Sequence, residues 1–293
     1  MGRPRRLQFP GACYHIVLSG NNRQDLFLSN QDRRHFLNLL RQYKERYDLK
    51  IYAYSLLDNS VELLLETRRP NLSLVMQSFN TVYTKYFNSA RGTSGHVFQG
   101  RYKALVVEKE TALLEMTIYV HLNSVRSGLK ERPWRYQWSS AGAYVEAGHR
   151  EPLIDSDEVL RRMGKSRFQQ SLKYLKLLKE RLKSQAQWVL PIIRGFCVGT
   201  EAYAARLETL PEPLSGNGGS EALARKIVAE TAQRHGMDAD KLLGRSQWRD
   251  VAAARREAMY RIWKEARLGV TEVARLFGRT PSAVSQAIRA LEK

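Results

Sequence analysis

The stretch Ile51–Glu66, IYAYSLLDNSVELLLE, most constrains the fold, because it is apolar enough for a sheet interior yet carries polar residues at alternate positions. Side chains on a strand point to one face at every second residue, so Ser60 and Glu62 share a face, which Asp58 joins if the strand is continuous. Asp58 and Asn59 can equally form a tight turn between two strands. In both cases we expect a central strand with a polar platform on one face.

Patterns on both sides of this stretch predict one α/β unit over residues 1–150. Helical spacing of apolar residues appears at 30–47, 71–88 and 110–123. Shorter strand-like runs occupy 14–18 and 102–108. A glycine-rich loop, residues 91–100, precedes the last of these strands.

Charge narrows the class of partner. The net charge is +19 and the pI is about 10.1, an excess that predicts a polyanion partner, nucleic acid before membrane. No run of eighteen apolar residues predicts a membrane span, and MGRPRRLQFPGA at the start lacks the apolar segment of a secretory signal. Two distant cysteines, Cys13 and Cys197, indicate a reducing compartment without a disulfide framework. We therefore expect a cytoplasmic protein.

Residues 151–215 are predicted to form a basic helical extension and a linker. The segment 161–183 carries nine Lys or Arg against one Glu. It can be a solvated helix that bridges two domains or a second surface for DNA phosphates. The stretch 211–220, PEPLSGNGGS, has the composition of a linker.

Residues 216–293 predict a compact all-α domain, with helices at 221–235 and 247–267. Thr280 suits an N-cap and Pro281 the first position of a last helix, which would bury Val284, Ile288 and Leu291. This is the pattern of a helix-turn-helix whose recognition helix enters a major groove. Its exposed face would carry Ser282, Ser285, Gln286 and Arg289. The alternative is a helical hairpin used for dimerisation.

Several segments resemble the REP-associated tyrosine transposases, relatives of the single-strand tyrosine transposases of insertion sequences. They are FPGACYHIVLSGNNRQDLF, AYSLLDNSVELLLE, LSLVMQSFNTVYTKYFN, SGHVFQGRYKALVVE, YVHLNSVRSGL and WSSAGAY, between about Arg3 and Tyr144. GFCVGTEAYAARL resembles the tail of longer members. The C-terminal domain resembles the DNA-binding domain of the replication initiator DnaA, through DADKLLGRSQWRDVAAARREAMY and LFGRTPSAVSQAI. The resemblance implies an α+β fold, a ferredoxin-like antiparallel sheet with helices on one face, and a homodimer.

The resemblance also implies a chemistry. In that family a tyrosine hydroxyl attacks a DNA phosphodiester, leaving a 5′-phosphotyrosine and a free 3′ hydroxyl, while a divalent metal polarises the phosphate. The tyrosine falls at Tyr119, between Ile118 and Val120, where an aromatic side chain would otherwise be taken for a core residue. The assisting amide falls at Asn123, four residues on and so on the same helical face.

The metal-binding histidine pair of that family falls on Ser60 and Glu62. Asp58, Glu62 and Asn123 could rebuild an oxygen site for Mg²⁺ or Mn²⁺, but carboxylates repel a DNA phosphate unless a metal lies between them. Without Lewis-acid help the step slows by roughly a thousandfold or more. We expect impaired cleavage and no tightly bound cofactor. The alternative is an active transposase that cleaves and rejoins single-stranded DNA through Tyr119.

Other positions are interpreted as structural or as DNA contacts. His15 lies in a strand, and His96 and His121 match family positions outside the metal pair, so we expect these two to be hydrogen-bonded structural or DNA-facing residues. The predicted DNA contacts are Arg3, Arg5, Arg6, Arg23, Arg101, Lys103, Arg126, Arg249 and Arg279, with the four residues of the recognition helix. Ser19 stands where the transposase family usually has Arg, so we expect a DNA contact to be lost there. Thr280-Pro281-Ser282 stand where the initiator has Asp-His-Ser/Thr, so we do not expect the initiator's own target.

The sequence thus predicts a DNA-binding protein of the transposase family. It would hold a hairpin or single-stranded repeat and a duplex site, as a nucleoid-associated regulator or architectural factor, without a small-molecule substrate. Composition also permits RNA binding, but no residue selects it.

Overall fold

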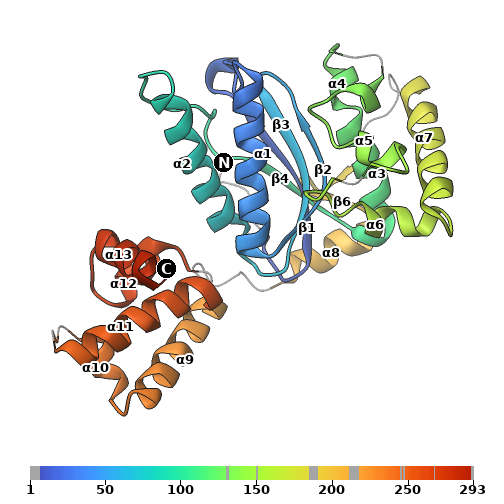
Figure 1. Ribbon diagram of the computed structural model, residues 1–293. Helices are drawn as coiled ribbons and strands as arrows, with labels where there is room; N and C mark the ends of the chain where they lie inside the picture. The colour runs from blue at the N-terminus through green and yellow to red at the C-terminus, as the bar shows by residue number, and fades with distance from the viewer. Residues whose placement is uncertain are drawn as a thin grey trace. The chain divides into compact units, whose positions relative to one another are not determined.

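The computed structural model describes residues 7–129, 132–149, 151–184, 191–210, 218–244, 246, 248–266 and 268–291. The chain divides into two compact units, Met1–Pro211 (unit 1) and Glu212–Lys293 (unit 2) (Figure 1). The predicted arm with Arg3, Arg5 and Arg6 lies outside the described residues.

A sheet forms the centre of unit 1, in the strand order β2-β3-β1-β4-β6-β5. Its four longer strands are antiparallel: β1 (Ala12–Ser19), β2 (Leu49–Leu56), β3 (Ser60–Thr67) and β4 (Lys103–Val107). Between β2 and β3 the amide of Leu57 donates to the carbonyl of Ser60 at 2.8 Å. The question left open at Asp58-Asn59 is therefore answered by a turn, and Ile51–Glu66 forms a hairpin.

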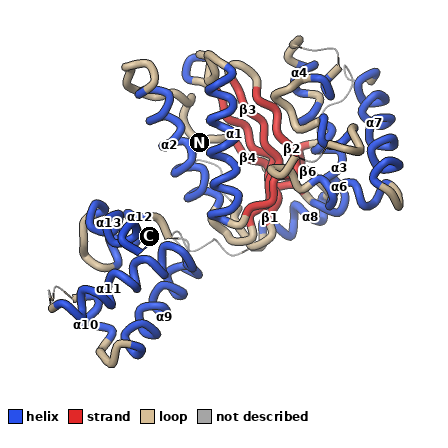
Figure 2. The backbone as a smooth tube through the Cα atoms, in the orientation of Figure 1, coloured by secondary structure: helices blue, strands red, loops and turns tan. Residues whose placement is uncertain are grey.

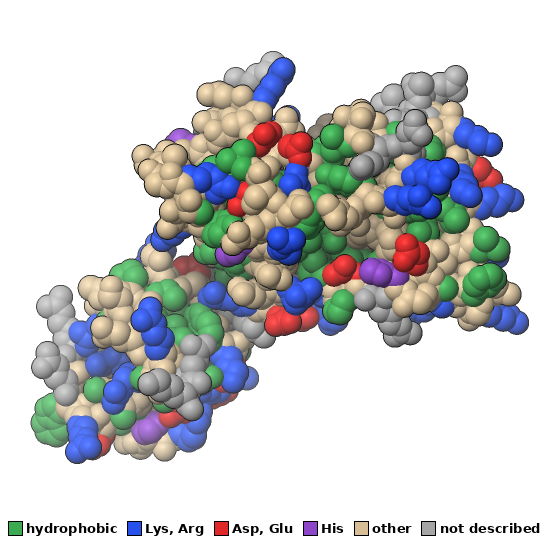
Figure 3. Space-filling model, turned by 45° about the horizontal axis from the view of Figure 1, so that its top comes forward, with side chains coloured by type: hydrophobic (Ala, Val, Ile, Leu, Met, Phe, Trp, Pro, Cys, Tyr) green, Lys and Arg blue, Asp and Glu red, His purple; other side chains and the backbone are tan. Residues whose placement is uncertain are grey.

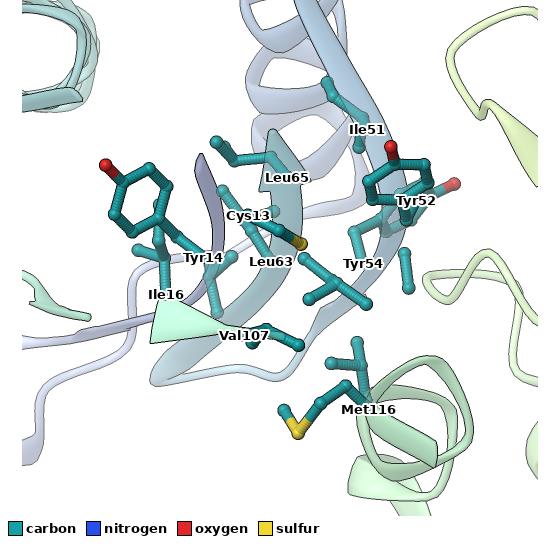
Figure 4. Packing of buried hydrophobic residues seen from close by; sticks show 14 of the residues in the cluster. Cys13, Tyr14, Ile16, Ile51, Tyr52, Tyr54, Leu63, Leu65, Val107 and Met116 are labelled. Atoms are coloured by element: carbon teal, nitrogen blue, oxygen red, sulfur yellow. The ribbon is translucent and has the colours of Figure 1, made fainter. Parts of the chain in front are cut away.

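Helices cover both faces of this sheet. α1 (Asn30–Tyr47) and α2 (Leu72–Ser89) lie on one face, and α3 (Lys109–His121) lies on the other (Figure 2). Successive residues of β1 point to opposite sides, with Cys13 toward the side of Met116 in α3 and Tyr14 away from it (Figure 4). The expectation of helices on one face is wrong, because the strands are apolar on both sides and each side needs a cover.

Two very short strands extend the sheet beyond β4, and the sequence did not predict them. β6 (Cys197–Val198) pairs in parallel with β4 and antiparallel with β5 (Ile192–Ile193), so the sheet is mixed. The side chain of Glu108 accepts a bond from the Thr200 amide at 2.7 Å, at the start of α8 (Glu201–Glu208). Strands of two residues are too short to show a period of two, which is why no pattern revealed them.

The rest of unit 1 is helical and packs on the side of α3 (Figure 1). The elements are α4 (Asn123–Arg126), α5 (Gly142–Val145), α6 (Ser156–Leu160) and α7 (Arg167–Lys183), with 3₁₀ turns at Pro133–Arg135 and Arg161–Met163. A further 3₁₀ turn, Asn21–Arg23, follows β1 and bonds to Val97 in the loop before β4. The basic helix α7 buries Tyr174 and Leu178 in the core of unit 1 and leaves Phe168 and Leu172 exposed. Cys13 and Cys197 are both free and buried.

Unit 2 consists of helices: α9 (Gly218–Arg234), α10 (Ala239–Leu243), α11 (Arg249–Arg261), a π-helical turn at Ile262–Ala266, α12 (Val270–Leu276) and α13 (Pro281–Leu291). Val284 and Ile288 of α13 are buried, as predicted. Leu291 was predicted to be buried but is 45% exposed, because it is the last residue of α13. No described helix of the chain combines the length and apolar character needed to span a bilayer.

Candidate functional site

Tyr119 lies on α3, against the strands β1 and β3. It is half-buried, and its ring meets the ring of His15 edge-on, with centroids 5.7 Å apart and planes at 85°. Burial raises the pKa of the Tyr119 hydroxyl, the Arg126 guanidinium opposes this shift, and the Glu62 carboxylate adds to it. The hydroxyl is therefore held in its protonated form at neutral pH and needs a base or an electrophile to act as a nucleophile.

Glu62 of β3 is a second polar residue of the sheet beside Tyr119, and its charge acts on the Tyr119 hydroxyl. Its side chain is only 11% exposed, and its Oε2 lies 3.3 Å from Nε2 of His15 on the neighbouring strand. Sequence reasoning predicted the face shared by Ser60 and Glu62 but did not select His15. The missing information was the register of β1 against β3, which places His15 opposite Leu64 and Val17 opposite Glu62.

Arg126 of α4 connects these groups. Its Nη2 donates to Oε1 of Glu62 at 3.2 Å and to Oδ1 of Asn123 at 3.3 Å. Its Nη1 donates to the carbonyl of Tyr119 at 2.6 Å, and its Cζ lies 3.6 Å from the centroid of the Tyr119 ring. We call these five residues, His15, Glu62, Tyr119, Asn123 and Arg126, the Tyr119 cluster.

The cluster does not fit a divalent metal ion. The oxygens of Glu62 and Asn123 that would be ligands already accept bonds from a guanidinium, whose charge repels a second cation at this range. The described residues contain no group of three or more His, Cys, Asp or Glu able to hold a metal. Two buried nitrogen atoms, Nδ1 of His15 and Nδ2 of Asn123, have no hydrogen-bond partner among the described residues, so the network is incompletely satisfied.

Asp58 is not part of this cluster. It lies in the turn before β3, where its side chain forms an ion pair with Arg33 of α1. Ser60, at the lost ligand position, is the first residue of β3 and stands opposite Ser19 of β1. The structure therefore brings together Tyr119, Glu62 and Asn123, and it places Asp58 with a different cation.

Two further histidines have different environments. His121 is buried, with Nδ1 2.7 Å from the Tyr174 hydroxyl and Nε2 2.8 Å from the Ser140 hydroxyl. Its burial lowers its pKa to about 3. The prediction of a hydrogen-bonded structural role for His121 is confirmed. His96 is exposed in its loop, where its backbone carbonyl accepts a bond from Gln24 at 3.4 Å.

The predicted DNA contacts of unit 1 lie largely at the surface. Arg23, Arg101 and Lys103 are exposed, and the last two line a shallow hollow with Ser19 at the junction of β1 and β4. Arg126 is the exception, since the Tyr119 cluster holds its guanidinium. Lys and Arg side chains are spread over the visible face of each unit (Figure 3).

In unit 2 the outer face of α13 is open. Ser282, Gln286 and Arg289 are exposed and Ser285 is half-buried. Arg249 is exposed at the first residue of α11. Arg279 differs, because its Nη2 donates to the carbonyl of Gly244 at 3.2 Å and so joins the start of α13 to the end of α10.

Known proteins resemble the first part of the chain. Residues 9–123 match the family described as transposase IS200 like, a segment that contains β1 to α3 and ends at Asn123. A solved REP-associated tyrosine transposase bound to a REP hairpin is similar at 18% sequence identity and a TM-score of 0.43, over 53% of this chain and 94% of that one. No curated protein matches significantly. Over residues 9–123, which include Tyr119, the chain is therefore similar to the IS200-like transposases.

Proposed function

We propose that this chain is a DNA-binding protein related to the tyrosine transposases, with cleavage impaired at Tyr119. A ferredoxin-like unit 1 holds a hairpin or single-stranded repeat, and a DnaA-like helix-turn-helix in unit 2 holds a duplex site. The single observation that carries the proposal is Arg126, whose guanidinium binds Glu62 and Asn123 and stacks on Tyr119.

The impairment follows from charge. Cleavage needs a cation that polarises the scissile phosphate, and a bound metal contributes several kcal/mol to that step. In the Tyr119 cluster the cation is the guanidinium of Arg126, which is already paired with the buried carboxylate of Glu62. This carboxylate neutralises most of the charge that would otherwise polarise a phosphate. The raised pKa of Tyr119 adds to the barrier, because the hydroxyl must lose its proton as it attacks.

Binding is supported by features outside the cluster. The net charge of +19 favours a polyanion, and Arg23, Arg101 and Lys103 are exposed in unit 1. The exposed face of α13 offers small polar side chains followed by Arg289, which suits a major groove. On this basis the protein acts as a regulator or an architectural factor at repeats. The homodimer and the association with the nucleoid rest on the resemblance to the tyrosine transposases.

The proposal is tested by separating binding from cleavage. Gel-shift titrations of the full chain with labelled hairpins and duplexes of genomic repeats should show affinity well above that for random DNA. The same labelled hairpins, incubated with Mg²⁺ or Mn²⁺, should give no covalent adduct on denaturing gels, with Tyr119→Phe as the matched blank. An adduct that disappears in Tyr119→Phe would instead establish the alternative, an active transposase. Affinity no better than for random DNA would overturn the binding role.

A further inference from the structure

A second polar site lies at the edge of the sheet, where the turn after β2, the start of α1 and the segment 135–138 meet. They enclose an open cavity of about 460 Å³. Its walls include Asn30, Arg33, Asp58, Arg135, Gln137 and Trp138, and we call it the Trp138 pocket. This volume is within the usual range for small-ligand sites, about 300–1,000 Å³. No residue of the Tyr119 cluster lines it.

The backbone at Trp138 is fixed by the sheet, and its side chain packs against the core of unit 1. The carbonyl of Trp138 accepts a bond from the Leu56 amide at 2.9 Å, and the next residue, Ser139, bridges to Ser55 of β2. Residues 138–139 thus continue the sheet at its outer edge. Trp138 is half-buried, so part of its ring remains accessible. A fixed, accessible aromatic ring is what a flat ligand needs for stacking.

A guanidinium completes this wall. Arg33 is 8% exposed, and its Cζ lies 5.6 Å from the Trp138 ring centroid and 5.4 Å from that of Phe27. Two aromatic rings and Asp58 therefore fix the Arg33 side chain. Its Nε is buried and has no hydrogen-bond partner among the described residues.

The lining of the pocket combines polar and apolar side chains, Leu129 and Tyr136 among the latter, and its charged groups carry a positive excess. Asp58 balances Arg33, but Arg135 is exposed and forms no ion pair within the described part of the chain. Asn30 and Gln137, both exposed, add amide donors and acceptors at the rim. An aromatic platform, an unbalanced cation and two amides match the three parts of a nucleotide, which are a flat base, a phosphate and a base edge.

We infer that the Trp138 pocket takes one unstacked nucleotide of a single-stranded DNA segment. The base stacks on Trp138, the 5′ phosphate meets Arg135, and Asn30 or Gln137 contacts the base edge. The inference deepens the proposed function of unit 1 and rests on it for the choice of DNA. A pocket open to solvent suits a nucleotide within a strand, because the strand can enter and leave on either side.

The direct test is photocrosslinking of the full chain to a pentathymidylate that carries one 5-iododeoxyuridine, followed by peptide mapping. We expect the crosslink on Trp138. Titration with the unmodified pentathymidylate should show a dissociation constant raised about 5-fold to 150-fold in Trp138→Ala and by less than 3-fold in Trp138→Phe, which retains a ring. Trp134→Phe is the matched control, since Trp134 lies nearby in sequence and packs against the core as Trp138 does, but it is outside the lining.

A second variant keeps the test independent of folding. Arg135→Ala removes an exposed side chain, and it should lower the slope of log affinity against log salt by about 0.7, the value for one phosphate of single-stranded nucleic acid. The same chemistry could come from a free nucleotide, so thymidine monophosphate is titrated as well. If it binds as tightly as the pentamer, the pocket does not select a nucleotide within a strand, and the inference is overturned.

The outcomes separate this inference from the proposed function. Hairpins that bind normally, without a crosslink at Trp138 and without an effect of Trp138→Ala, would overturn the pocket and leave DNA binding intact. A crosslink at Trp138 in a chain that does not bind hairpins or duplexes would support the pocket and overturn the proposed function. Absence of binding to the pentamer and to the hairpins would overturn both.

Discussion

The Tyr119 cluster of unit 1 and the outer face of α13 in unit 2 treat polar side chains in opposite ways. In the cluster, Glu62 is nearly buried and Arg126, Asn123 and His15 surround it. On α13 the side chains of Ser282, Gln286 and Arg289 are exposed. One set of groups is occupied within the protein, and the other remains available to a partner.

Chemistry and recognition place different demands on polar side chains. A reacting site needs polar atoms that are positioned but free to bind substrate, whereas a recognition surface needs side chains that reach beyond the backbone. In the cluster the polar atoms are well positioned but not available to a substrate, since the oxygens already accept hydrogen bonds from the Arg126 guanidinium. On the α13 face the side chains are free to contact a partner, and the helix that carries them is fixed because Val284 and Ile288 on its other side are packed in the core. Substitutions at either site test this contrast.

The largest effect is expected from Arg126→Met. The change leaves the carboxylate of Glu62 almost buried without its cation, and breaking such a pair costs about 3 kcal/mol. We expect a loss of that size in the free energy of unfolding of unit 1, measured by urea titration at pH 7. Arg34→Met, an exposed arginine of α1, is the control and should change stability by less than about 0.5 kcal/mol.

A second substitution shows whether the charge is the cause. Glu62→Gln added to Arg126→Met removes the stranded carboxylate, so it should recover at least about 1 kcal/mol of the loss. If Arg126→Met were as stable as the unmodified chain, the guanidinium would not be held by the cluster, and the contrast with α13 would disappear.

The sequence predicted the local parts of this cluster better than their assembly. The resemblance selected Tyr119 and Asn123, and their spacing predicted one helical face, although the structure ends α3 at His121 and begins α4 at Asn123. Strand periodicity placed Ser60 and Glu62 on one face. The bounds of α1 also followed from sequence, because Ser29 and Asp32 form a capping box at its start. The approach of His15 to Glu62 depends on strand register, and the bond from Arg126 to Glu62 depends on the packing of the helices on the sheet, both of which link residues far apart in sequence. The same limit hid β6 beside β4.

The next effect is pH-dependent and confined to unit 1. Burial lowers the pKa of His121 to about 3, below its usual 6.5, so the folded state binds fewer protons than the unfolded state between these values. The contribution of neutral His121 to stability is therefore fully present above pH 6.5 and is lost as the pH falls toward 3. The linkage amounts to about 2 kcal/mol between pH 8 and pH 5.

Urea titrations at the two pH values measure this effect. His121→Gln should flatten the dependence, although it lowers stability overall, and His96→Gln, at an exposed residue, should leave the dependence unchanged. In unit 2, His235 lowers the pKa of Glu257 below its usual 4.5, so that stabilisation is lost only at more acidic pH. Hydrogen exchange measures the stability of each unit separately. Equal losses of stability in both units between pH 8 and pH 5 would contradict the assignment to His121.

A smaller change should affect binding without stability. Gln286→Glu places a carboxylate on the exposed face of α13, where it would repel duplex phosphates. We expect about tenfold weaker duplex binding in gel shifts, or about 1.4 kcal/mol, with no change in hairpin binding. Gln233→Glu makes the same change on α9 and is the matched control. Equal weakening by both substitutions would mean that net charge, rather than α13, determines binding.

The smallest effect distinguishes DNA binding by the exposed face of α13 from binding by positive charge spread over unit 2. Arg289→Ala removes one exposed cation from the last turn of α13, and if Arg289 neutralises one phosphate, the slope of log affinity against log salt should fall by about 0.9. Arg225→Ala on α9 also removes an exposed cation and should leave the slope unchanged. Salt titrations of duplex binding measure both. If the two variants lower the slope equally, the positive charge of unit 2 acts over its whole surface, and α13 is no more open to DNA than the helices around it.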